Sequence, residues 1–333
     1  MHMADALISP AVGGTMWAAG AGLLAWCARK VRQTLDNRRV PMMGVLGAFI
    51  FASQMINFTI PATGSSGHLG GGLILAVLLG PHAAFLVMAS VLTVQALFFA
   101  DGGLLALGCN VWNLGFYPAF IAYPLIYRPL AGSDRRGGRA WAAAILAAVI
   151  GLQLGAFSVV LQTTASGISD LPFGAFVLLM SPVHLAIGLV EGLATAAVVA
   201  FVARARPEAV ESDSAPTGMT KVFVGLALAA VLIGGVVSWF ASAHPDGLEW
   251  SVAKVTGREE LESAGPIHEA LARVQKKTAV LPDYNFKNAE DAGDAWPAVN
   301  TGTSVSGLVG GALVLALAGL AGLALRPWRA VVK

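Results

Sequence analysis

Long apolar runs alternate with short polar or basic segments along almost the whole chain. A helix needs roughly 20 apolar residues to cross a hydrocarbon core about 30 Å thick, and most of these runs reach that length. The pattern predicts apolar helices at about residues 11–30, 41–60, 69–82, 83–100, 104–127, 140–162, 173–203, 220–241 and 303–325. We therefore expect an all-α, polytopic membrane helix bundle, with about seven transmembrane helices followed by about two in a C-terminal module.

The stretches 69–82 and 83–100 form one apolar run broken at Gly80-Pro81-His82, so a single tilted helix is the alternative. Cytoplasmic loops are enriched in Lys and Arg, and placing every basic cluster there requires an odd number of crossings between residues 69 and 127. Three crossings fit the length better than one. The N-terminus and loop 61–68 then lie outside the cell and the C-terminus inside. The clusters are Arg29, Lys30, Arg32, Arg38 and Arg39; Arg128, Arg135, Arg136 and Arg139; Arg204, Arg206 and Lys221; and Arg326, Arg329 and Lys333.

A polar, Pro-containing stretch at 204–219 has no apolar periodicity and is typical of a cytoplasmic linker. It separates a first predicted domain, residues 1–203, from a second, residues 220–333. The second domain has one apolar helix, a hydrophilic segment at about 242–302, and a last apolar helix. This layout predicts two helices around an extracytoplasmic loop.

Composition supports a multi-pass protein of the cell membrane. Apolar residues make up 56% of the chain and charged residues 12%, against roughly 25% charged in soluble domains. No basic face accompanies the net charge of +2, so a nucleic-acid partner is not expected. The two cysteines, Cys27 and Cys109, lie within apolar runs and are expected to be packing residues rather than a disulfide or a metal pair.

His2 has chemistry that no later histidine shares. The α-amine of Met1, the amide of His2 and the His2 Nδ1 atom can close two fused chelate rings on a metal, and the planar peptide keeps them flat. Flat nitrogen sets suit Ni(II) or Cu(II) better than tetrahedral Zn(II). Removal of Met1 normally requires a small second residue, so we expect Met1 to be retained. A disordered terminal histidine is the alternative.

His68 is the best partner for this chelate. It follows an irregular Pro- and Gly-rich loop at the predicted membrane face, where backbone outside a helix must be buried in protein or line a wet cavity. Capping of the following helix is the alternative role. Asn57 and Ser66 could orient the imidazole, although closing the loop on itself is the preferred interpretation for each. Asp101 is expected to be a loop or helix-capping residue first, and a carboxylate at the entry of the site second.

His184 and Glu191 lie seven residues apart and share one face of the predicted helix 173–203. Ionisable groups within a membrane are costly and usually face the protein interior. These two residues could belong to an ion or proton pathway, or they could form a contact that holds helices together. His82 falls on the cytoplasmic side of the predicted topology and is left out of the site.

Several catalytic motifs are missing from the sequence. There is no G-x-x-x-x-G-K-[ST] phosphate loop, no H-E-x-x-H pair and no G-x-S-x-G elbow. We therefore expect no enzyme activity, no catalytic cofactor and no ATPase of the chain's own. The alternatives are a membrane metallopeptidase using His184 and Glu191, and a non-transporting assembly or sensor subunit.

Four segments together resemble the CbiM/NikM substrate-binding subunits of energy-coupling factor (ECF) transporters for nickel and cobalt. They are Met1–Pro10, Asn57–His68, Phe99–Asn110 and Pro182–Gly192. The resemblance covers roughly residues 1–203. Further on, His244-Pro245-Asp246-Gly247-Leu248-Glu249-Trp250 resembles the signature of the PDGLE domain, which is similar to the small CbiN/NikN subunits. The whole chain is thus similar to fused NikMN proteins.

The resemblance implies a square-planar site made by the Met1 amine, the His2 amide, the His2 ring and the His68 ring. Ala6 stands where the family usually has Gly, and the family often has a second Pro near Thr59; these differences could alter the fit of the loop without removing a ligand. The implied partners are a transmembrane coupling subunit similar to CbiQ/NikQ and cytoplasmic ATPases similar to CbiO/NikO. Nickel is the expected substrate, because flat nitrogen coordination favours Ni(II) over Co(II); cobalt import for cobalamin biosynthesis is the alternative.

Overall fold

The computed structural model describes residues 2–34, 40–132, 135–206, 218–258, 261, 265–287 and 296–325. Within these ranges the protein is almost entirely helical, as predicted, with one short hairpin. In the first part of the chain the elements are η1 (Asp5–Leu7), α1 (Pro10–Thr34), α2 (Val40–Gln54), β1 (Phe58–Ile60), β2 (Ser65–Gly67), α3 (Gly72–Leu79), α4 (Pro81–Val94), η3 (Gln95–Phe99), α5 (Leu107–Val111), η4 (Trp112–Tyr127), α6 (Arg128–Ala131), α7 (Gly138–Ser166) and α8 (Phe173–Ala205).

Five of the described helical segments are long and apolar enough to cross a membrane: Pro10–Thr34, Pro81–Phe99, Gly138–Ser166, Phe173–Ala205 and Thr301–Ala324. Two shorter apolar helices, α2 and α10 (Thr220–Gly235), accompany them. Each lies where hydropathy predicts a helix. The predicted linker 204–219 falls mainly outside the described residues, as do Arg38 and Arg39 of the first basic cluster and Arg326, Arg329 and Lys333 of the last.

The apolar stretch from 69 to 100 is two helices rather than one. The chain breaks at Gly80, whose φ of 81° is accessible to glycine, and Pro81 then begins α4. Helix α3 has eight residues and is therefore only about 12 Å long at a rise of 1.5 Å per residue. It is too short to cross a bilayer alone and packs inside the protein, with every side chain buried.

The predicted helix 41–60 is wrong in its last six residues, because α2 ends at Gln54 and a β-hairpin follows. Strands β1 and β2 pair antiparallel, with Thr59 opposite Ser66. The turn between them contains Pro61 and two residues with positive φ, Ala62 and Gly64. These conformations cannot continue a helix, so the backbone pairs with itself instead.

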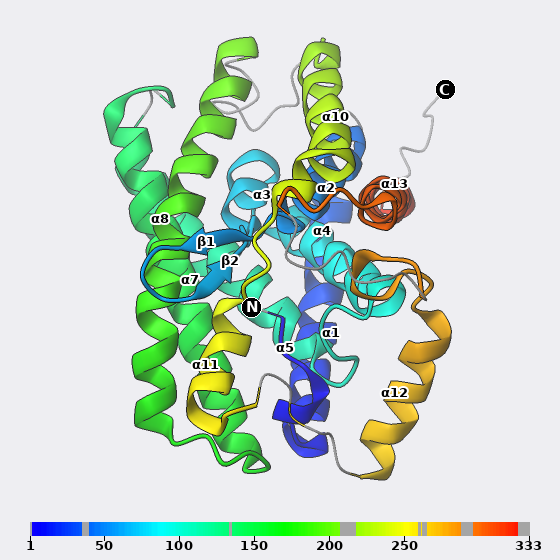
Figure 1. Ribbon diagram of the computed structural model, residues 1–333. Helices are drawn as coiled ribbons and strands as arrows, with labels where there is room; N and C mark the ends of the chain where they lie inside the picture. The colour runs from blue at the N-terminus through cyan, green and yellow to red at the C-terminus, as the bar shows by residue number, and fades with distance from the viewer. Residues whose placement is uncertain are drawn as a thin grey trace.

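The C-terminal part folds back over the first part. It contains α10, η5 (Val237–Phe240), α11 (Gly247–Thr256), α12 (Pro266–Thr278), η6 (Pro282–Tyr284) and α13 (Thr301–Ala324). Helices α10 and α13 pack against the buried helix α2, while α11 lies beside β2 and α8 (Figure 1). Hydropathy gave no indication of α11 and α12, which lie within the polar segment 242–302.

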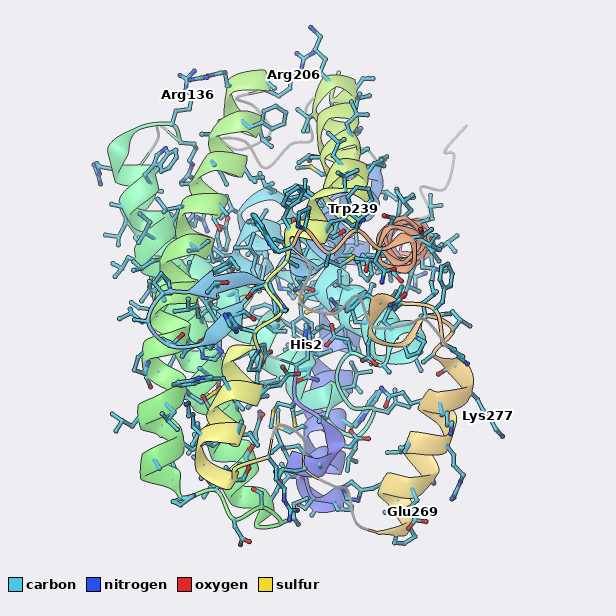
Figure 2. All side chains as sticks on the ribbon, in the orientation of Figure 1. His2, Arg136, Arg206, Trp239, Glu269 and Lys277 are labelled. Atoms are coloured by element: carbon cyan, nitrogen blue, oxygen red, sulfur yellow. The ribbon has the colours of Figure 1, made fainter. Side chains whose placement is uncertain are left out.

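Helices α7 and α8 form a long antiparallel pair along one side of the molecule (Figure 1). Figure 2 shows Arg136 and Arg206 together at one end and Glu269 and Lys277 toward the other, with His2 in the middle. In this view His2 therefore lies between the two ends of the molecule.

Candidate metal site

The N-terminal segment is held inside the protein by backbone hydrogen bonds. The Met3 N–H donates to Asn110 Oδ1 at 2.8 Å, and Asn110 Nδ2 donates back to the Met3 carbonyl at 3.2 Å. The Gly103 N–H donates to the same carbonyl at 2.9 Å. The Met3 side chain is fully buried. Because both polar groups of the Met3 peptide are fixed, the neighbouring His2 cannot be a loose end.

A carboxylate adds a second anchor two residues further on. Asp5 Oδ1 accepts from the Ala106 N–H at 3.0 Å, near the start of α5. Burial raises the pKa of Asp5, while the hydrogen bond from Ala106 opposes that shift. A side chain at Gly103 would collide with Asp5, so the close approach of the two segments depends on glycine at that position.

His2 and His68 lie face to face. Their ring centroids are 5.0 Å apart and their planes differ by 6°. The His68 Nδ1 atom is 3.0 Å from the Leu69 carbonyl, which can only accept, so Nδ1 carries the proton and Nε2 the lone pair. Burial is the largest cause that lowers the pKa of His68, to about 3. The ring is therefore neutral at physiological pH, which is the form that binds metal.

Asp101 and Tyr284 extend this pair into a chain of contacts. His2 Nδ1 lies 3.1 Å from Asp101 Oδ1, and the Tyr284 hydroxyl donates to Asp101 Oδ2. Burial opposes ionisation of Asp101, but His2 and the Tyr284 hydroxyl hold the pKa of that carboxyl well below its usual range. Burial and the Asp101 charge raise the pKa of Tyr284. The η6 segment of the C-terminal part thus reaches a side chain that touches His2.

A cavity of about 660 Å³ adjoins both histidines. It lies between the two parts of the chain and is lined by residues of both. The ionisable side chains in its lining include His2, His68, Asp5, Asp101, Asp246, Glu249 and His268. A cavity lined by carboxylates beside two imidazoles can attract a divalent cation.

The other predicted site residues have different roles. Asn57 lines the cavity, and its carbonyl accepts from the Ser242 N–H at 2.7 Å. The Ser66 hydroxyl donates to the His244 carbonyl at 2.7 Å rather than to an imidazole. Met1, the remaining predicted ligand, lies outside the described residues. The Thr59 hydroxyl donates to the Ser242 hydroxyl at 2.9 Å.

His184 and Glu191 are both buried in α8, but each forms its hydrogen bonds with other partners. His184 Nδ1 is 2.8 Å from the Met180 carbonyl one turn earlier. Glu191 accepts from the backbone N–H groups of Gly70 and Gly71, which favours the helix-fastening interpretation. His82 packs against Trp26 and Phe120, away from the site. Cys27 and Cys109 are buried and free, as predicted.

Among the described residues, no three side chains of His, Cys, Asp or Glu gather in an arrangement that could hold a metal ion. The nitrogen-rich arrangement consists of two imidazoles and the backbone at the start of the chain. Tyr284 and Asn110 complete the surroundings of His2. No pattern in the sequence points to Tyr284, while Asn110 lies within the segment 99–110 that carries the family resemblance.

These features define a membrane-type helical protein in which His2, near the start of the chain, stacks on the buried His68 beside a cavity. Residues 2–209 match the CbiM family, described as the cobalt uptake substrate-specific transmembrane region, and residues 220–327 match the PDGLE domain. A protein of Archaeoglobus fulgidus that carries the name NikMN is 33% identical over 95% of this chain and 96% of its own length. The fused nickel transport protein NikMN of Rhodobacter capsulatus is 31% identical, with 96% of each chain covered.

Two further comparisons cover the first part of the chain. The cobalt transport protein CbiM of Sorangium cellulosum is 33% identical over 50% of this chain and 75% of its own. The crystal structure of a truncated transition metal transporter matches with a TM-score of 0.54 and 29% identity, covering 62% of this chain and 99% of that one. The chain belongs to the CbiM family of nickel and cobalt transport proteins and carries a C-terminal PDGLE domain. It is a transport protein, not an enzyme.

Proposed function

We propose that this protein is the substrate-specific component of an ECF-type importer and that it captures a divalent transition metal, nickel in the first place. The observation that carries the proposal is the pairing of His2 with His68 in the protein interior. The family membership supports metal transport in general, and the chemistry of the donors supports the choice of metal. Cobalt import by the same mechanism is the second candidate, because the CbiM relative is named as a cobalt transporter.

In the proposed site the ion is held in a plane by four nitrogens. They are the Met1 amine, the His2 amide, His2 Nδ1 and His68 Nε2. The neutral tautomer of His68, with its proton on Nδ1, presents the nitrogen that this scheme requires. Affinity for nitrogen ligands rises from Co(II) to Ni(II), and planar coordination favours Ni(II) further.

Loading the ion requires the His2 ring to turn. Its Nδ1 atom faces Asp101, whereas the chelate needs Nδ1 on the metal. Rotation about the Cβ–Cγ bond moves Nδ1 to the opposite edge of the ring and brings Nε2 toward the side of Asp101. His2 Nε2 is buried without a hydrogen-bond partner among the described residues, so the rotation would give it one. A carboxylate on the outer nitrogen of a metal-bound imidazole fixes its orientation and raises its basicity.

The direction and energy of transport come from partners in this proposal. The N-terminus and the cavity face outward, the basic ends of the helices face the cytoplasm, and the C-terminus lies inside. A CbiQ/NikQ-like coupling subunit and CbiO/NikO-like ATPases would drive release inward, since the sequence contains no phosphate loop. In this proposal residues 1–203 form the metal-binding domain and residues 220–333 form the accessory module.

The test uses the full-length protein with a C-terminal tag, purified in detergent and offered equal nickel, cobalt and copper. One extra N-terminal residue removes the terminal amine from the chelate and should abolish high-affinity nickel binding. His68→Ala should also abolish it, while His244→Ala, a change to an exposed ring, should not. Nickel binding by the extended chain at the native level would refute the chelate. Preferential retention of cobalt would favour the second candidate.

A further inference from the structure

The backbone that follows His68 is clamped from two sides within the helix bundle. Both oxygens of Glu191, on α8, accept from consecutive N–H groups: Gly70 at 2.7 Å and Gly71 at 3.1 Å. On the other side, Gln54 Nε2, at the end of α2, donates to the Gly70 carbonyl at 2.8 Å. The peptide groups around Gly70 are therefore fixed through both their donors and their acceptor.

The clamp is buried and reinforced. Glu191 is 1% exposed and Gln54 is 4% exposed. Gln95, fully buried at the start of η3, donates to Gln54 Oε1 at 2.8 Å and fixes the direction of its amide. Burying polar groups in a membrane helix bundle is expensive unless each has partners, so this arrangement of three side chains on three elements is a specific one.

The clamp is joined to the His68 ring by a short covalent path. His68 Nδ1 donates to the Leu69 carbonyl, and Leu69 immediately precedes the clamped Gly70. A side chain at Gly70 would place its Cβ 2.9 Å from Glu191 Oε2, so glycine allows the carboxylate to approach the backbone. Any shift of the 69–71 backbone would move the carbonyl that sets the tautomer and orientation of the imidazole.

We propose that Glu191 and Gln54 are positioning residues that hold the His68 imidazole in the orientation needed for planar coordination, and so contribute to the choice of metal. This inference rests on the proposed function. Neither side chain needs to touch the ion. Their contribution is to fix the position of His68 Nε2. The other three nitrogens of the proposed site come from the first two residues, so His68 is the one ligand that these two side chains can position.

The test compares Glu191→Gln, Gln54→Met and Thr195→Ala in the otherwise native protein. Glu191→Gln keeps one oxygen that can accept from the glycine backbone, but it places an NH₂ group against the other glycine N–H donor. Gln54→Met keeps the size of the side chain and removes the donor to Gly70. Thr195 is the matched control, because it lies one turn after Glu191, is fully buried, and its hydroxyl has no hydrogen-bond partner among the described residues.

Three properties are measured: thermal unfolding without metal, nickel affinity, and the nitrogen splitting in the electron paramagnetic resonance spectrum of the Cu(II)-loaded protein. We expect Glu191→Gln and Gln54→Met to weaken nickel binding by about 10- to 100-fold, the usual effect of losing an orienting contact. The Cu(II) spectrum should lose the signal of one nitrogen. Thr195→Ala should match the wild type in affinity and spectrum.

The outcomes separate the clamp from the proposed function. If the wild type binds nickel and both clamp variants fold and bind it with wild-type affinity and spectrum, the clamp is overturned and the proposed function stands. If Glu191→Gln does not fold, the nickel affinity and the Cu(II) spectrum of Gln54→Met alone decide whether the clamp positions His68. A wild type that binds no nickel overturns the proposed function and the inference together.

Discussion

At the scale of single residues, the orientation of His2 depends on a partner that comes from the far end of the sequence. Tyr284 stacks on Phe99, with centroids 5.0 Å apart and planes 16° from parallel, and its hydroxyl donates to Asp101. Asp101 in turn contacts His2. The C-terminal part therefore reaches His2 through Asp101, by way of the Tyr284 hydroxyl group.

Tyr284→Phe isolates that hydroxyl group. The aromatic stack on Phe99 should survive, while Asp101 loses one of its two partners and is freer to turn away from His2. We expect nickel affinity to fall by about 10-fold, measured by isothermal titration on the purified protein. Tyr117→Phe removes a hydroxyl from η4, where the Tyr117 ring packs edge-on against Phe116, and it should leave affinity unchanged. Equal affinity in both variants would mean that Tyr284 contributes packing alone.

The sequence identifies side chains whose chemistry is unusual. It does not identify the partners that the folded chain places beside them. His2 and His68 stood out because of position and loop composition, and the structure brings their rings together. Tyr284 looked like any loop tyrosine, since its use depends on a contact across 183 positions. Glu191 could be called buried and functional from its place in an apolar run, but its two glycine partners could not be predicted.

At the scale of elements, hydropathy predicts helices well and short irregular segments poorly. The long spans α7 and α8 lie close to their predicted limits because every residue in them must satisfy its backbone within the helix. The hairpin 58–67 was predicted as helix in part, because Phe58 and Ile60 continue the apolar run of α2. Helices α11 and α12 were missed because they are polar and lie outside the membrane-type pattern.

The junction of β2 with α3 offers a prediction about glycine. Gly71 has a φ of 77°, and a Cβ there would lie 2.7 Å from Ile50 Cγ2. Gly64 has nearly the same φ of 76° but open space around it. Each Gly→Ala change should lower the free energy of unfolding by about 1–2 kcal/mol, because alanine disfavours the left-handed backbone. Gly71→Ala should lower it by about 1–3 kcal/mol more, because the added methyl group overpacks the site. Thermal unfolding of the two variants measures the difference.

The same pair separates stability from metal binding. Gly71→Ala moves the backbone next to His68 and should weaken nickel binding, whereas Gly64→Ala, at the tip of the hairpin, should retain it. If both variants unfold at the same temperature, the contact with Ile50 is relieved by a small shift and does not constrain the loop.

At the scale of the whole molecule, the two parts of the chain interlock around the cavity. The strand β2 is flanked by the PDGLE segment: the Ser66 N–H donates to the Pro245 carbonyl at 2.8 Å, and Ser66 forms a parallel bridge with Asp246. Further away, His268 Nε2 is 2.9 Å from the Ile8 carbonyl, and Gln275 donates to the carbonyls of Ala96 and Gly102. The accessory module therefore contacts the N-terminal segment, the hairpin and the Asp101 loop at once.

One close approach between the two parts is where α11 meets α8, and it yields the last prediction. A Cβ at Gly247 would lie 2.5 Å from Val183 Cγ1 and 3.3 Å from His184 Cε1. Gly247→Ala should push α11 away from α8 and cost about 1–3 kcal/mol of stability, with faster proteolysis within 248–287. Val183→Ala removes the obstructing methyl group, so the double variant should be less destabilised than the sum of the two single changes. Strictly additive effects would show that the modules dock without close contact here, and the fused chain would then resemble two independent domains joined by a linker.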